Sequence, residues 1–193
     1  MTDLQDPRDV LRGALDQAGA LIAGVKPDQL SDPTPCDEFD VATLINHLTG
    51  AVARVGSVAA GVQIEGQLIV DAKEPAEGWV GAFAAARQGA IGAWADDALL
   101  AKEFTLPWAT LPGAGIVSMY ALETVLHGWD LAVATGQEHL LDHSLAEAVF
   151  PAARQMLPVD IRGGEMPFEA VVEVGADASA SDRLAGFAGR AKP

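Results

Sequence analysis

The sequence predicts a mainly α-helical protein, a four-helix bundle with a short C-terminal extension. Apolar residues recur at helical spacing in four long segments, and most of these segments end at a proline or a glycine. Hydrophobic residues make up 50% of the 193 residues, which is enough for a core without disulfides. We therefore expect one domain over residues 1–193, in which residues 161–193 form the small C-terminal extension.

The first helix is expected to begin at Pro7, because Asp6 can cap it and proline favours the first helical position. Pro27 ends this helix. Two prolines keep the following loop, residues 31–40, extended. Asp40, the last residue of the loop, is expected to cap the second helix.

The second helix has an apolar stripe over residues 41–55 and is expected to stop near Gly61. Residues 63–71 are expected to form a loop with a little strand. Pro75 then opens a third helix, which runs to Trp94 and carries apolar residues at helical spacing.

Residues 102–112 are expected to be irregular, because they contain two prolines. The fourth helix is almost wholly apolar over residues 116–133 and is expected to end near Gly136. A helix that is apolar on nearly all sides belongs at the centre of a bundle.

A fifth helix over residues 145–157 is expected, with Asp142 or Ser144 as its cap. After it the pattern changes. Residues 168–174 alternate enough to suggest an extended segment. A short terminal helix is expected from Ser181 to Gly189, with its first residue as the cap.

Composition and charge exclude several classes of partner. The formal net charge is −15, and the basic residues are scattered without forming a patch. Nucleic acids and anionic membranes both require such a patch, so neither is expected as a partner. The first residues are acidic and polar, so no signal peptide is expected and a cytoplasmic location is favoured. The single cysteine, Cys36, excludes an internal disulfide.

Glu123 and His127 give the best indication of function. They are four residues apart, so a helix stacks them on one face, one turn apart. An ionised carboxylate among apolar neighbours costs several kcal/mol unless a proton, a charge or a metal compensates it. On spacing alone, a buried ion pair or a hydrogen-bonded pair explains these two residues at least as well as a metal site does.

His47 on the second helix is the third candidate ligand. Two ligands on one helix and one on a facing helix leave an open coordination position, as a catalytic metal site requires. Imidazole and carboxylate suit zinc, nickel or iron, so the ligand types do not choose the metal. Taken by itself, His47 is equally well explained as a half-exposed helix histidine.

Four other residues have a structural and a functional interpretation. Arg54, two turns from His47, either meets an anionic substrate or makes a surface salt bridge. Trp129 is a core residue or a pocket wall. Asp130 orients a ligand or pairs with a backbone group or an arginine, and Cys36 is a buried filler or a reactive thiol.

Several separated segments together resemble a known family. They are the stretches 34–41 and 46–48, the block Glu123–Leu131, and the closing stretch 177–190. On these segments the chain resembles the DinB/YfiT-like superfamily. Within it, the chain is most similar to an actinobacterial metal-binding group related to the N-terminal domain of mycothiol-dependent maleylpyruvate isomerase. The resemblance runs from about residue 8 to 190.

The resemblance implies a DinB-like bundle and assigns the metal ligands to His47, Glu123 and His127, with zinc as the favoured metal and nickel or iron still open. One departure is Phe39, where the family usually has tryptophan. A second departure is length, because the isomerase carries an additional C-terminal α/β domain that this chain is expected to lack.

Two functions follow as hypotheses. In the first, a metal-dependent enzyme activates a low-molecular-weight thiol, mycothiol by resemblance, for S-transfer or isomerisation of a small electrophile. We then expect a thiol pocket walled by residues near Phe39, Trp108 and Trp129. In the second, the chain is a non-catalytic metal-binding or small-ligand-binding protein. The expected partners are a small-molecule substrate and the thiol, and a homodimer is an open option.

Overall fold

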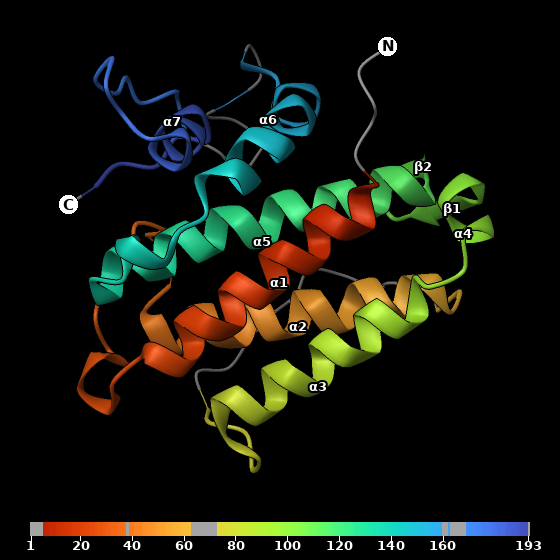
Figure 1. Cartoon of the computed structure of the whole chain (residues 1–193), viewed down its shortest axis with the longest axis horizontal. Coiled ribbons are helices and arrows are strands. Elements are labelled where there is room, and N and C mark those ends of the chain that lie inside the picture. The colour runs from red at the N-terminus through yellow and green to blue at the C-terminus, as the bar shows by residue number, and fades with distance from the viewer. Residues whose placement is uncertain (1–5, 38, 63–72, 160–161, 163–168, 193) are drawn as a thin grey trace.

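The computed structural model describes residues 6–37, 39–62, 73–159, 162 and 169–192. These residues form mainly helices, with one two-stranded sheet (Figure 1). The predicted all-α fold class is therefore confirmed. Among the helices in these ranges, none combines the length and the apolar character needed to span a membrane.

The first two long helices begin where the sequence predicts. Helix α1 (Pro7–Gly24) follows Asp6, whose carboxylate accepts a hydrogen bond of 2.9 Å from the backbone nitrogen of Arg8. Helix α2 (Val41–Ala59) follows Asp40, whose carboxylate accepts one of 2.8 Å from the backbone nitrogen of Thr43. A short 3-10 helix, η1, covers Pro27–Gln29 between them.

Helix α3 (Gly78–Ala93) begins three residues later than predicted. Pro75 does not open the helix, because its carbonyl instead accepts a hydrogen bond of 2.9 Å from the nitrogen of Gly78 and so closes a turn. Gly78 has a φ of 73°, a conformation that glycine adopts without strain. The expected loop and strand over residues 63–71 lie outside the described residues.

The segment predicted to be irregular contains a hairpin. After the four-residue helix α4 (Ala98–Ala101), strand β1 (Glu103–Leu106) pairs antiparallel with strand β2 (Ala109–Pro112). The prolines do not prevent this pairing. Pro107 lies in the turn and Pro112 ends β2, two positions where a missing N–H disrupts little of the ladder.

Helix α5 (Gly113–Thr135) is the centre of the fold and ends at Gly136, which has a φ of 69°. It packs against α1 and α2, and α3 packs against both of those helices, so α1, α2, α3 and α5 form the four-helix bundle (Figure 1). Fully buried side chains of the bundle come from all four helices. They include Leu15, Leu21, Leu44, Leu48, Phe83, Ile116 and Leu131.

The C-terminal helices lie on one side of α5 (Figure 1). A second 3-10 helix, η2 (Glu138–Leu140), leads to helix α6 (His143–Met156), which is capped by Asp142. Helix α7 (Ala180–Phe187) is capped by Ser179 rather than by the predicted Ser181. No strand forms over the described residues 169–175.

Ser181 makes a tertiary contact instead of capping α7. Its side chain is buried, and its hydroxyl lies 2.9 Å from Nδ1 of His143 at the start of α6. This hydrogen bond joins the two C-terminal helices, which also pack against each other.

Candidate metal centre

The bundle brings together the three residues predicted as metal ligands. His47 lies on α2, and Glu123 and His127 lie one turn apart on α5. Nε2 of His47 is 2.9 Å from Oε1 of Glu123, and Nε2 of His127 is 3.8 Å from the same oxygen. One potential ligand atom from each residue lies within 4.8 Å of the other two. We call this group the His47–Glu123–His127 cluster.

The cluster lies at the edge of the core, partly open to solvent. The side chains of His47 and His127 are 14% and 10% exposed, and the side chain of Glu123 is 36% exposed. The two imidazole rings are 4.8 Å apart between centroids. The ring of Phe39, from the loop before α2, lies 4.9 Å from the His47 ring and 6.2 Å from the His127 ring, so it shields one side of the cluster.

Asp130 fixes the orientation of the His127 ring. Its Oδ2 lies 3.0 Å from Nδ1 of His127, and its side chain is completely buried. A carboxylate can only accept a hydrogen bond, so Nδ1 of His127 carries the proton. Nε2, which faces Glu123, then offers its lone pair. A carboxylate that orients a histidine in this way is the usual partner of a metal-binding imidazole.

The electrostatics keep Glu123 ionised. Burial by itself would raise the pKa of this carboxyl. The hydrogen bond from His47 and the positive charges of His127, His47 and Arg190 outweigh burial, so the pKa lies below its ordinary value. At neutral pH the cluster therefore contains a carboxylate oxygen and two imidazole nitrogens.

Arg190 and Cys36 also reach this region, and no local pattern in the sequence singled out Arg190. Nε of Arg190 lies 3.3 Å from Oδ1 of Asp130, and its Nη2 lies 3.4 Å from Sγ of Cys36. Cys36, His127 and Asp130 form a second group whose potential ligand atoms lie within 4.8 Å of one another. The only signal for Arg190 was its place in the closing stretch that carries the family resemblance.

Arg54 and Glu123 both act electrostatically on Tyr120. Burial raises the pKa of the Tyr120 hydroxyl to about 12, the charge of Arg54 opposes this rise, and the charge of Glu123 adds to it. Tyr120 therefore lies within the electrostatic reach of both charged residues. This placement keeps Arg54 as a candidate for meeting an anionic group beside the cluster.

The two tryptophans predicted as pocket walls have different positions. Trp129 is buried, and its Nε1 donates a hydrogen bond of 2.9 Å to Oδ1 of Asp182 on α7. Trp108 is 56% exposed in the turn of the hairpin. In the described part of the chain, its ring makes no contact with the rings of Phe39, His47 or His127. Of the three expected wall residues, Phe39 is the one in contact with the cluster.

The donor set fits a divalent cation. Two imidazole nitrogens and one carboxylate oxygen are the three protein ligands of a common type of catalytic zinc site. They come from facing helices, and Asp130 already orients one of them. Beside the cluster, the loop before α2 borders a hollow of about 290 Å³ whose lining includes Phe39. Phe39 borders this hollow and also packs on both imidazole rings, whereas His47, Glu123 and His127 do not line the hollow.

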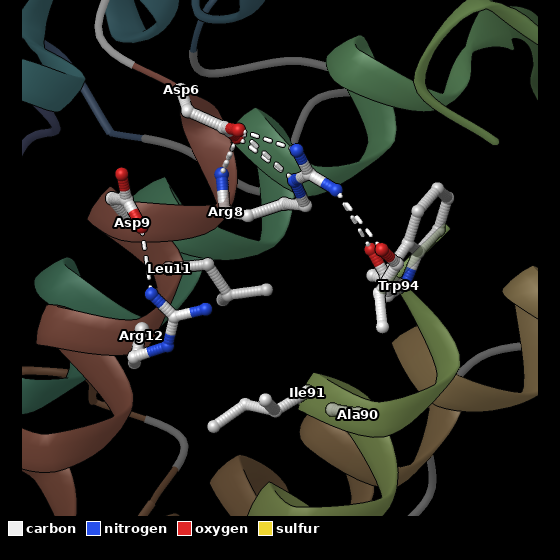
Figure 2. Close-up of a pocket in the computed structure, with 9 residues that line it drawn as sticks. Asp6, Arg8, Asp9, Leu11, Arg12, Ala90, Ile91 and Trp94 are labelled. Carbon is white, nitrogen blue, oxygen red and sulfur yellow. Dashed lines mark hydrogen bonds and ion pairs between the residues drawn. The ribbon is translucent and has the colours of Figure 1, made fainter. Parts of the chain in front are cut away.

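A second hollow, of about 300 Å³, lies between the start of α1 and the end of α3 (Figure 2). Arg8 there pairs with Asp6 and Asp97 and also donates to the carbonyls of Trp94 and Ala95. Figure 2 shows the bonds of Arg8 to Asp6 and to the two carbonyls, and also the pairing of Arg12 with Asp9. We call this region the α1–α3 hollow.

Comparison with known proteins gives a family and two relatives. Residues 11–132 match the family described as mycothiol maleylpyruvate isomerase N-terminal domain. Two uncharacterized proteins of Mycobacterium tuberculosis, from strains CDC 1551 / Oshkosh and ATCC 25618 / H37Rv, are each 34% identical to the chain over 185 residues. The alignment covers 96% of the chain and 98% of each relative. No solved structure gives a significant match.

Proposed function

Because this chain belongs to the mycothiol maleylpyruvate isomerase N-terminal domain family, we propose that it is a divalent-metal-dependent enzyme acting on a small electrophile. Its second reactant is a low-molecular-weight thiol, and the family name points to mycothiol. The reaction is S-transfer or thiol-assisted isomerisation. We further propose that His47, Glu123 and His127 hold the metal, with zinc as the favoured ion and nickel or iron as alternatives.

One observation carries the proposal. Two histidine nitrogens and one glutamate oxygen, from two different helices, converge to within 4.8 Å of one another. Asp130 is placed so that His127 presents Nε2 to the same point. In the metal-free protein, Nε2 of His47 donates a hydrogen bond of 2.9 Å to Glu123, and a cation bound by the three residues would take the place of that proton.

Each residue of the proposed site has a separate role. A bound divalent cation would lower the pKa of a coordinated thiol and hold it as the thiolate. Glu123 supplies the negative charge of the ligand set, and the two histidines supply neutral nitrogens. Phe39 covers the imidazole rings and limits water on that side. The proposed role of Arg54, whose charge acts on nearby Tyr120, is to meet an anionic group of a substrate.

The alternative is a non-catalytic metal-binding or ligand-binding protein that uses the same three ligands. Thiol consumption separates the two functions. Zinc-loaded protein would be mixed with mycothiol and chlorodinitrobenzene, in which the thiolate displaces chloride from the ring. Loss of thiol and release of chloride would be followed over time.

The proposed enzyme accelerates this loss above the rate with zinc alone, and the His127→Ala variant does not. The matched control is His139→Ala, which removes an exposed histidine of the short helix η2 and should leave the rate unchanged. A rate equal to the zinc blank, in protein shown to hold one zinc ion, would favour the non-catalytic alternative.

A further inference from the structure

We propose that Arg190 is a positioning residue of the metal centre, which holds Asp130 in place behind His127 and ties the loop of Cys36 to it. The proposal rests on the function proposed above in taking His127 as a metal ligand. It assigns a role in the site to the C-terminal tail, which lies outside the 11–132 region matched by the family.

Asp130 requires a positively charged partner. Its side chain is completely buried, and a buried carboxylate is strongly destabilising unless charge and hydrogen bonds compensate it. His127 supplies a hydrogen bond of 3.0 Å to Oδ2. Arg190 supplies the opposite charge, with its Nε 3.3 Å from Oδ1 and 3.4 Å from Oδ2. Arginine is suited to this position because it stays charged when buried.

The chain delivers Arg190 through a specific backbone turn. Gly189 has a φ of 84°, and a Cβ at this residue would lie 2.7 Å from the carbonyl oxygen of Glu169. Only glycine fits there, and it turns the chain at the end of α7. The backbone nitrogen of Arg190 then donates to the carbonyl of Ala185 at 2.9 Å, which fixes the start of its side chain.

A second contact keeps α7 against α5. Oδ1 of Asp182 accepts a hydrogen bond of 2.9 Å from Trp129, the residue immediately before Asp130. Lys192, beyond Arg190, lies 3.0 Å from the same oxygen of Asp182. The tail is thus fixed to α5 at two consecutive residues, and the Arg190 side chain, 13% exposed, is held at the second one.

The other end of the guanidinium reaches the loop before α2. Nη2 of Arg190 lies 3.4 Å from Sγ of Cys36, and Phe39 of the same loop packs against both imidazole rings of the cluster. One side chain therefore connects the tail, helix α5 and the loop that covers the site. Loss of this side chain should loosen His127 and the loop together.

The test uses Arg190→Gln, with Arg183→Gln as the matched control. Arg183 lies on α7 and is exposed, so it carries the same substitution without touching the centre. The first readout is nitrogen NMR of the histidine rings in metal-free protein, where His127 should show a proton on Nδ1. Arg190→Gln should reduce that tautomer, and Arg183→Gln should leave it unchanged.

The second readout is cobalt binding followed by visible absorption. Removal of an outer partner of a metal ligand typically weakens metal binding about 10–100-fold, and we expect about 10-fold for Arg190→Gln, with a changed cobalt spectrum. Arg190→Lys should recover part of the affinity, because it keeps the charge but not the fork that reaches Cys36. A general loss of packing would not be rescued in this way.

If both glutamine variants show the same His127 tautomer and the same cobalt affinity as the wild-type protein, the proposed role of Arg190 is overturned. If Arg190→Gln fails to fold, the His127 tautomer and the cobalt affinity are measured in Arg190→Lys instead. Values equal to those of the wild-type protein in that variant would also overturn the role of Arg190. If the wild-type protein binds no cobalt, the proposed function fails, while the NMR of the metal-free protein still reports on Arg190. The two proposals can therefore fail separately.

Discussion

The α1–α3 hollow and the His47–Glu123–His127 cluster both gather charged or polar side chains, and they differ in how those groups are matched. In the hollow, each arginine faces an aspartate, and Arg8 also donates to two carbonyls at the end of α3 (Figure 2). Both arginines therefore have acceptors in the chain itself. The hollow is therefore accounted for as a junction between two helices.

In the cluster, the balance is different. Glu123 contributes a carboxylate that lies beside two imidazole rings. His127 donates its Nδ1 proton to Asp130, so it has no proton to donate to Glu123. His47 donates to Glu123 at 2.9 Å, whereas Nε2 of His127 carries no proton and lies 3.8 Å from the same oxygen. The comparison teaches that a hollow lined by charged side chains does not by itself identify a functional site. The approach of an imidazole lone pair to a carboxylate, within a group of three possible ligands, does.

The largest expected effect is on metal binding at the cluster. His127→Ala should weaken zinc or cobalt binding by more than about 100-fold, beyond the usual effect of losing an outer partner of a ligand. The fold should survive, because the bundle has its own apolar core. Calorimetric titration and circular dichroism check both parts, with His139→Ala as the control. An unfolded His127→Ala variant would show that the metal is structural.

The next effect concerns stability rather than metal. Leu44 is completely buried on α2, one turn before His47. Leu44→Ala should lower the free energy of unfolding by about 2–5 kcal/mol, because it leaves a cavity in the core. Denaturant unfolding measures this change. The variant should still bind metal at temperatures where it is folded, and loss of binding in the folded variant would show that the cluster depends on local packing.

A smaller effect is expected in acid, at the anchor of the C-terminal tail. Burial acts to raise the pKa of Asp182, but hydrogen bonds from Trp129, Lys192 and Ser179 outweigh it and lower the pKa. The folded state therefore favours the carboxylate. The resulting stability is present above the ordinary carboxyl pKa of about 4, and it is lost as the pH falls through the lowered value.

Thermal unfolding of wild type and Asp182→Asn, measured from neutral pH downward, tests this assignment. The wild type should be the more stable protein at neutral pH, and the difference should shrink below about pH 4. A difference that stays constant through this range would mean that Asp182 does not carry the acid dependence.

The smallest effect is expected in the α1–α3 hollow. Arg8→Gln removes the ion pairs with Asp6 and Asp97 but touches no residue of the cluster. Metal affinity should therefore equal that of the wild type in the same titration. A weakened affinity would contradict the separation of the two regions on which the comparison rests.

The sequence predicted the long helices well because their signals are local. Asp6 and Asp40 cap α1 and α2 as expected, and Gly136 ends α5. The hairpin at residues 103–112 was missed because its strands have only four residues each, and because two prolines led us to expect an irregular segment. The start of α3 was misplaced because Pro75 belongs to a turn that ends at Gly78.

The candidate site was only partly predictable. Glu123 and His127 are visible from their spacing, His47 was a candidate because it lies on another helix of the bundle, and the family resemblance then assigned all three as ligands. The wall residue Trp108 was placed by its nearness in sequence to α5, but the hairpin holds it exposed. Arg190 lies 60 residues from Asp130 in the chain, and nothing in the local sequence indicates that the tail folds back onto α5.

Absorption spectroscopy of the cobalt-loaded protein during a thiol titration tests the central claim most directly. If the cluster holds the metal with a position open to a thiol, a sulfur-to-cobalt charge-transfer band should grow to saturation with mycothiol. Glu123→Gln, which removes the ligand charge, should weaken the band, and Glu138→Gln, at an exposed residue of η2, should not. A protein that holds one cobalt ion and shows no such band with any low-molecular-weight thiol would contradict the account.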